Sequence, residues 1–457
     1  MSKDYDYTPE EQQRNRVLKY QFQQLKDIHF NMSDAEDCIS ESEELLSSLG
    51  YEKEIAKQKQ KAKEKAGHRT RHVKVMPEWE ELCKEANAQT PEKVSLTVFF
   101  TEEELSVNRK YIEKLNDDYN AIHRLDKTDW TICVVAGIVS AAVDILFVGI
   151  PERSKTGTKA GALSNYIRSY FEKKFPPEEM EMLGGKHFVK TPYDAQDNRN
   201  TTVYVDGLST YYHRLLSLGH DPILGFIVGV MDIMRGTMTT IDKKGKIVSQ
   251  VMDVYTDRKE TNLFEALTKH LLHLKSDLTT SMGLPVPLMG LFNLLQFGSI
   301  GEEKQTIAEI VQGMYYEGYD FIHFCSMSIP VMLTEIIFRL CWCIKRIKEG
   351  YTLKESLPYS TNRETKPKLA TMLFIAHSAA TAINAGKVAF TENPMAINYP
   401  QWLAFGKYAF SQLQWSLIQK PQLRDRYVMQ IIEEERTGIL EEINKNYNEF
   451  ICSSLEI

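Results

Sequence analysis

The stretch WTICVVAGIVSAAVDILFVGIP, residues 130–151, marks the point at which the character of this chain changes. The preceding sequence is polar, whereas apolar stretches of helical length recur from here onward. Such runs are too long for ordinary strands and are buried by helix packing. The sequence therefore predicts a mainly α-helical protein whose core, residues 128–457, is a large multi-helix bundle. The apolar stretches are residues 130–150, 222–236, 264–280, 326–346, 370–387 and 402–419.

The first stretch is about long enough to cross a bilayer, but it contains Asp144. A charge at the centre of a bilayer costs about 2.5–3.5 kcal/mol even on the most permissive insertion scale. The other stretches are shorter or contain Asp232, Glu335 with Arg339, or His377. We therefore expect buried helices in a bundle, and a shallow contact with a membrane is left open.

The N-terminal segment, residues 1–127, is expected to be a polar helical appendage. Ser33 and Glu36 fit a capping box, and Gly50 is placed to end the helix that they start. A second capping box predicts another helix start at Thr101.

A basic run lies within this appendage. Residues 52–74 contain nine Lys or Arg against three Glu. The run suits an anionic membrane surface, and it equally suits a solvated helix and linker. It lacks the aromatic side chains on which bases stack, and the net charge of the whole chain is -7. No specific nucleic acid partner is therefore predicted.

Two regions interrupt the helical pattern. Residues 176–207 are rich in Gly, Pro, Asn and Asp and predict an extended loop or lid. Residues 238–254 predict a small β-hairpin that turns at Lys244 and Gly245.

The cysteines and the N-terminal sequence indicate the cellular compartment in which we expect the protein. The seven cysteines are odd in number and lack C-x-x-C spacing, which argues against a disulfide framework and a thiolate zinc site. The N-terminus has no apolar leader. We expect a cytoplasmic protein, either free or peripheral to the inner face of a membrane.

The stretch KHLLHLKSDLTTSMGLPVP, residues 269–287, carries polar residues on an apolar helix. At 100° per residue, His270, His273 and Asp277 lie within about 60° of one another. An i, i+4 pair of His and Asp can converge on a divalent ion. A His and Asp that only hydrogen-bond each other inside a core would have the same spacing, so both interpretations stay open.

The pattern extends beyond this pair. His273, Asp277, Thr280, Gly283 and Pro285 give H-x-x-x-D-x-x-T-x-x-G-x-P. This resembles the carboxy-proximal motif of the bacterial membrane-bound, metal-dependent hydrolases, and more loosely the H-x-x-x-D helix of the helical zinc phospholipase C and nuclease family. The likeness covers about fifteen of the 457 residues. It implies that His273 and Asp277 are metal ligands.

A second element lies upstream, in YYHRLLSLGHDPILGFIVGVMDIMRGT, residues 211–237. The hydrolase family carries an H-R pair followed shortly by T-H-S, and His213 with Arg214, then His220 with Asp221, is similar to it. The gap is longer here, and Asp221 stands where the family has Ser. The resemblance implies metal ligands in this element. Helix capping by Asp221 is the alternative.

Other polar residues lie on the apolar helices. A buried carboxylate without a partner costs several kcal/mol, so Asp144 and Asp232 must meet cations, hydrogen-bond donors or a metal. Glu335 and Arg339 form an i, i+4 pair of opposite charge. The candidates for buried polar groups that support a ligand are Asp144, Asp232, Asp320, His323, Glu335 and His377.

The sequence therefore predicts a metal-dependent hydrolase that acts on a phosphodiester or phospholipid-like substrate, with zinc as the first expectation for the ion. Phosphate-binding loops, dinucleotide fingerprints and H-E-x-x-H or EF-hand patterns do not occur. The alternative is a non-catalytic helical protein that binds a membrane or a partner as an effector or assembly factor. The expected metal ligands are His213, His220, Asp221, His270, His273 and Asp277.

Overall fold

The computed structural model describes residues 6–66, 78–90, 92–154, 157–300 and 303–455. Its contacts divide the chain into two units, Met1–Asp117 and Asp118–Ile457. Both are built mainly from α-helices, and the described residues contain two small two-stranded sheets. The predicted fold class, a mainly α bundle with a small hairpin, is confirmed.

The first unit contains long polar helices. The helix α1 begins beside a capping box formed by Thr8 and Glu11 and runs without a break through Ser33. The predicted helix start at Ser33 is therefore wrong, because no Gly or Pro interrupts the earlier helix and the Ser side chain alone does not end it. The predicted end is confirmed, since Gly50 adopts a φ of 87° just after the helix. The elements are α1 Pro9–Ser48, α2 Glu52–Ala66, α3 Trp79–Gln89, η1 Leu96–Phe99 and α4 Glu102–His123, which continues into the second unit.

The basic run is described only in part. Residues 52–66 belong to α2, whose described side chains are almost all exposed. Residues 67–74 lie outside the described part of the chain. The start of α4 confirms the capping box predicted there, because Thr101 Oγ1 accepts the N–H of Glu104 at 3.2 Å.

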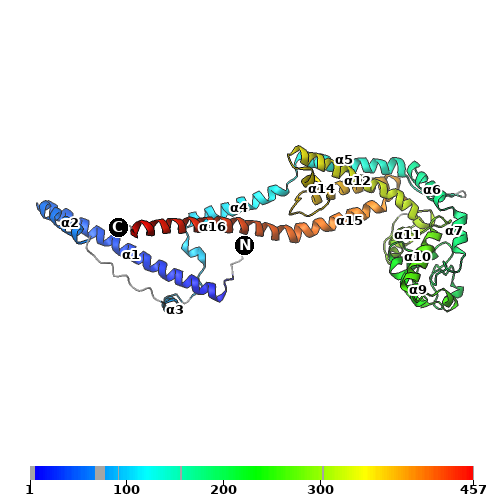
Figure 1. The fold of residues 1–457 in the computed structure, drawn as a ribbon, viewed down its shortest axis with the longest axis horizontal. Coiled ribbons are helices and arrows are strands. Elements are labelled where there is room, and N and C mark those ends of the chain that lie inside the picture. Colours follow the sequence, from blue (N-terminus) through cyan, green and yellow to red (C-terminus); the bar gives the residue numbers. More distant parts are fainter. Residues whose placement is uncertain (1–5, 67–77, 91, 155–156, 301–302, 456–457) are drawn as a thin grey trace. The chain divides into compact units, whose positions relative to one another are not determined.

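Four apolar helices pack together in the second unit, and Figure 1 shows α5, α12, α14 and α15 beside one another. Their core contains Cys133, Ala136, Phe338 and Leu373. A Cβ on Gly137 would lie 2.7 Å from a backbone oxygen of α14, so this glycine lets the two helices approach closely. The elements are α5 Lys127–Val143 with the π-helical turn η2 Asp144–Val148, α12 Phe321–Lys348, α13 Leu353–Ser356, α14 Leu369–Thr391, η8 Pro394–Ala396, α15 Tyr399–Gln414, η9 Trp415–Gln419 and α16 Lys420–Leu455.

Three helical runs in this bundle are long and apolar enough to cross a membrane: the run that ends at Val148, α12 and α14. The charges that argued against a membrane span have partners inside the bundle. Asp144 lies 2.9 Å from Lys387 Nζ and accepts a hydrogen bond from Asn398 at 2.7 Å. Asp144 thus meets a cation and a hydrogen-bond donor, as we expected of a buried carboxylate, and the cost that we assigned to it in a membrane span is reduced.

A segment of mixed structure, residues 149–320, is inserted between α5 and α12. Its hairpin β3–β4 confirms the predicted turn, because Ile241 pairs with Ile247 across Lys244 and Gly245. The loop predicted at 176–207 contains a helix, α7, that begins with the favourable Pro177. The elements are β1 Glu152–Ser154, β2 Gly157–Lys159, α6 Ala162–Lys174, α7 Pro177–Gly184, η3 Asn198–Asn200, α8 His213–Leu216, η4 Leu218–His220, η5 Leu224–Phe226, α9 Val228–Arg235, β3 Thr237–Ile241, β4 Ile247–Val251, η6 Asp253–Arg258, α10 Leu263–Asp277, η7 Met289–Leu294 and α11 Ile307–Tyr316.

The apolar stretch 222–236 departs from the single helix that we expected. It forms the short turn η5 and then α9. A Cβ on Gly225 would lie 2.6 Å from the carbonyl oxygen of Gly219 and 2.7 Å from the ring of His270. Close packing at this glycine therefore takes precedence over a regular helix.

Candidate metal centre

Four separate segments supply side chains to one buried site. The helix α10 provides His273 and Asp277 one turn apart, and α8 and η4 provide His213 and His220. Asp194 comes from the irregular segment between α7 and η3. The three histidines and Asp277 are at most 5% exposed, whereas the side chain of Asp194 is 21% exposed.

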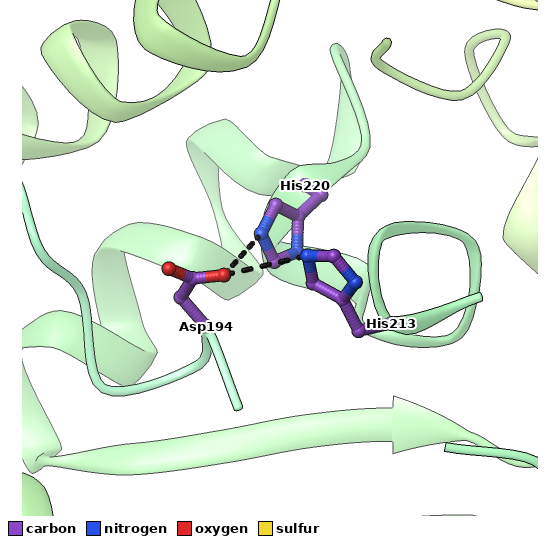
Figure 2. A group of neighbouring side chains, drawn as sticks. All are labelled: Asp194, His213 and His220. Carbon is purple, nitrogen blue, oxygen red and sulfur yellow. Dashed lines mark ion pairs between the residues drawn. The ribbon is translucent and has the colours of Figure 1, made fainter. Parts of the chain in front are cut away.

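The potential ligand atoms converge. In Figure 2 the carboxylate of Asp194 faces the imidazoles of His213 and His220, with Oδ1 at 3.5 and 3.6 Å from their Nε2 atoms. The Nε2 atoms of His220 and His273 are 3.2 Å apart. Oδ2 of Asp277 lies 3.6 Å from each of these two nitrogens. His220 thus belongs to two groups of possible ligands, which suits one or two ions.

These separations fit a divalent metal. Ligand bonds of about 2.0–2.2 Å in a tetrahedral site place neighbouring ligand atoms about 3.3–3.6 Å apart. Nε2 of His213 and Oδ2 of Asp277 are buried and have no hydrogen-bond partner among the described residues. Buried polar atoms without partners are costly, and an ion held by the group to which each atom belongs would satisfy it. A set of imidazole and carboxylate donors suits several divalent transition metals, zinc and iron among them.

Neighbouring groups orient the ligands. Nδ1 of His213 lies 3.0 Å from the carbonyl oxygen of Thr210, a contact that leaves Nε2 facing the site. The edge of the Tyr193 ring packs against His220 and His273, with ring centroids 5.1 and 5.4 Å away. The Nδ1 atoms of those two histidines have no partner among the described residues, so packing holds their rings.

Arg214 contacts three residues of the H-x-x-x-D-x-x-T-x-x-G-x-P motif, namely Asp277, Thr280 and Gly283. Its Nη2 lies 3.0 Å from Oδ1 of Asp277, so Oδ2 is left facing the histidines. Its Nη1 donates to Thr280 Oγ1 at 2.5 Å and to the carbonyl oxygen of Gly283 at 3.5 Å. Gly283 adopts a φ of 63°, a conformation that favours glycine. The Thr and Gly of the motif therefore position the arginine that orients the motif's Asp.

The protonation states also suit a cation. Burial lowers the pKa of His213 to about 4, and burial is likewise the main cause of the lowered pKa of His273. Burial opposes ionisation of Asp194, but the hydrogen bond from His220 and the neighbouring imidazoles lower its pKa overall. At neutral pH the imidazoles of His213 and His273 are therefore neutral and the carboxylate of Asp194 is charged, the states that metal binding requires.

Two expected ligands lie outside the converging group. Nδ1 of His270 is 2.9 Å from the hydroxyl of Tyr193, and its ring packs against two glycines. Asp221 accepts hydrogen bonds from the backbone N–H groups of Ile223, Leu224 and Leu288 at 2.9, 2.9 and 2.5 Å. Burial is the main cause of the raised pKa of Asp221. Its contacts are those of the capping alternative.

The expected buried polar groups in the inserted segment and at the start of α12 are held by local partners. Asp232 accepts hydrogen bonds from the hydroxyls of Thr237 and Thr239 at 2.6 and 2.9 Å. Asp320 binds Arg168 at 2.7 Å and caps α12 through the N–H of His323 at 2.9 Å. Neither aspartate is among the converging residues.

The remaining polar groups are inside the bundle. Glu335 binds Arg339 at 2.7 Å, as predicted, and also contacts His377 at 3.4 Å. His377 in turn lies 3.2 Å from the side-chain amide of Gln401 and stacks on a tyrosine ring. Asp144 pairs with Lys387. These residues form polar contacts between helices, and they are separate from the converging group.

Sequence reasoning missed Asp194. It lies in the Gly- and Pro-rich region that we expected to be a loop or lid, and no motif spacing connects it to the histidines. An acidic residue in a long irregular segment of an otherwise helical chain is a weak indication of function.

Comparison with protein-family models, with curated proteins and with solved structures finds no match to this chain. The candidate site therefore depends on its own geometry.

Proposed function

We propose that the protein is a metal-dependent hydrolase. Its divalent ion would be held by Asp194, His213, His220, His273 and Asp277. One observation carries this proposal: His220 and His273 are 53 positions apart, yet their Nε2 atoms face each other at 3.2 Å in a buried site that also contains unpaired ligand atoms.

A divalent ion in such a site supplies two kinds of chemistry, because it lowers the pKa of bound water and polarises a phosphoryl oxygen. The exposure of the ligand side chains indicates the side from which a substrate would reach the ion. Asp194 is the most exposed of the five residues, so a substrate would approach from its side. Arg214 neutralises one oxygen of Asp277 and leaves the other for the ion.

The bundle supports a membrane substrate. Three helical runs have the length and hydropathy of membrane spans. Their outer faces carry exposed apolar side chains, including Ile138 on α5, Leu146 on η2, and Met332, Ile336 and Leu340 on α12. Exposed apolar surface of this extent indicates contact with lipid or another apolar partner. We infer that the helices span a membrane and that the substrate is a phospholipid or a related phosphodiester.

The experiment compares two histidines of the same helix. We would purify the wild-type protein without a histidine tag and measure bound metal together with hydrolysis of bis(4-nitrophenyl) phosphate. His273→Gln should lose at least tenfold in both bound metal and rate. His270→Gln is the matched control, because it removes a buried imidazole that lies outside the converging group. Both variants should keep the wild-type circular dichroism spectrum.

Equal metal content in the two variants would refute the assignment of His273. A folded wild-type protein that binds no zinc, manganese or iron would refute the hydrolase proposal. It would favour the alternative, a non-catalytic protein that binds a membrane or a partner.

A further inference from the structure

An apolar cavity of about 320 Å³ lies where the inserted segment meets the bundle. None of the residues that line it is charged. Water in such a cavity would make few hydrogen bonds, so an apolar occupant is favoured. The walls include Met289, Phe292, Val311, Met314, Trp402 and Leu403.

A hydrogen bond connects the wall of the cavity to the candidate metal centre. Asp221 directly follows His220 and accepts the N–H of Leu288 at 2.5 Å. The next residue, Met289, lines the cavity. One hydrogen bond thus connects the turn that carries a proposed ligand to the cavity wall.

The cavity is also continuous with an exposed apolar surface. Trp402 and Leu403 line it and are 40% and 41% exposed at the start of α15. Further along the same helical run, Phe410, Leu413 and Leu417 are exposed as well. In a membrane this stripe would contact acyl chains, and Trp402 and Leu403 belong both to the stripe and to the wall of the cavity.

We propose that this cavity binds one acyl chain of a membrane phospholipid. At about 30 Å³ for a water-sized group, it has room for about ten methylene groups. This inference rests on the proposed function for one point only, namely that the bound phospholipid is the substrate of the metal centre.

The test is photocrosslinking in bilayers. The full-length protein would be placed in vesicles of phosphatidylethanolamine and phosphatidylglycerol that contain a trace of phosphatidylcholine with a diazirine near the end of one chain. Mass spectrometry should find crosslinks at Met289 or Phe292. Val311→Trp fills the cavity and should reduce them at least tenfold, whereas Val254→Trp, at a position 62% exposed outside the lining, should leave them unchanged.

Two further arms complete the test. Leu403→Trp at the exposed rim should reduce the crosslinks even if the Val311 variant does not fold. His273→Gln should retain them, because chain binding needs no metal, so failure of the hydrolase proposal would be distinguishable. The inference is overturned if wild-type crosslinks avoid the cavity, if Val311→Trp and Leu403→Trp both crosslink normally, or if only a free diazirine fatty acid labels the cavity.

A separate observation, the distribution of positive charge, bears on which side of the membrane the candidate site occupies. The short loop 349–368, between α12 and α14, contains Lys354, Arg363, Lys366 and Lys368. The loop 392–398, at the opposite end of α14, contains no Lys or Arg. Short loops rich in Lys and Arg remain on the cytoplasmic side.

Other sequence features agree with this bias. Residues 420–426, at the start of α16, add Lys420, Arg424 and Arg426 to the positive end. The segments before and after α5 contain similar numbers of Lys and Arg, so they do not contradict this difference in charge between the two ends of the bundle. None of the seven cysteines lies in residues 149–320, so an oxidising compartment would form no disulfide within this segment.

We infer that the loop 349–368 is cytoplasmic and that the inserted segment with the candidate metal centre is on the non-cytoplasmic side. This revises our expectation of a cytoplasmic protein. In intact cells, a membrane-impermeant maleimide should label Ser249→Cys in the inserted segment. It should label Ser360→Cys in the basic loop only after the membrane is permeabilised.

Both positions are exposed, and the unsubstituted protein measures labelling of the native cysteines. The reverse pattern, or equal labelling of both variants in intact cells, would overturn the orientation.

Discussion

Arg214→Met would remove the cation that faces Asp277 and keep a side chain with an apolar stem. Arg214 Nη2 lies 3.0 Å from Asp277 Oδ1, and the two side chains are 12% and 7% exposed. Removing one partner of such a buried pair costs about 3–5 kcal/mol, because the other charge is left uncompensated. We expect the metal-free variant to lose about this much free energy of unfolding.

A bound ion should reduce that loss, because Asp277 would keep a cationic partner at Oδ2. What remains is mainly the hydrogen bond from Arg214 to Thr280, worth about 1.5–3 kcal/mol for a charged donor. The difference is about 2 kcal/mol, so the variant should bind zinc about 30-fold more tightly than the wild-type protein. The physical reason is that the positive charge of the arginine opposes the ion.

The assay is thermal unfolding of the detergent-solubilised protein with excess chelator and with saturating zinc, together with a competition titration of zinc. Arg168→Met is the matched control. Arg168 lies 2.7 Å from Asp320, and these side chains are 17% and 4% exposed, but the pair is outside the converging group. Its loss of stability should be the same with and without zinc.

Two results would refute this reasoning. One is an equal loss of stability for the Arg214 variant with and without zinc. The other is weaker zinc binding by that variant. An equal loss would show that Oδ2 of Asp277 does not face a bound ion, and weaker binding would show that the orientation of Asp277 by Arg214 outweighs the repulsion between the arginine and the ion.

Three further predictions concern packing, charge and metal. Gly225→Ala would place a Cβ 2.6 Å from a backbone carbonyl oxygen and should cost about 1–3 kcal/mol in chemical denaturation, whereas Gly313→Ala, with no atom within 4 Å, should stabilise by about 0.5–1 kcal/mol. Lys387→Met leaves Asp144 without a cation and should lower the free energy of unfolding by about 3–5 kcal/mol. Adding Asp144→Asn should recover most of this loss, and a double variant no more stable than the single one would contradict the pairing. Chelation should lower the melting temperature of the wild-type protein, and an unchanged value would contradict a structural contribution of the metal.

The helical architecture could be predicted from the sequence because apolar residues recur at helical spacing over long stretches. The capping box at Thr101 and the turn at Gly245 were also predictable, since both depend on neighbours within a few residues. The start predicted at Ser33 was wrong for a related reason. A local capping signal does not reveal that a helix already passes through it.

The candidate site was predictable only in part. The i, i+4 spacing of His273 and Asp277 places both on one helical face, whatever surrounds them. No spacing in the chain indicated that Asp194 would join them, or that His270, on the same face, would instead contact Tyr193. Those outcomes depend on which segment packs against which part of the helix.

The sequence by itself determined the helices, the hairpin and the pairs of polar residues within one or two turns, because these depend on propensities and spacings along a few residues of chain. Only the tertiary structure decided which imidazoles and carboxylates converge and which buried charges find partners, as Asp144 does with Lys387. The physical reason is that the packing of apolar surface positions distant segments against one another, and their polar groups meet as a result.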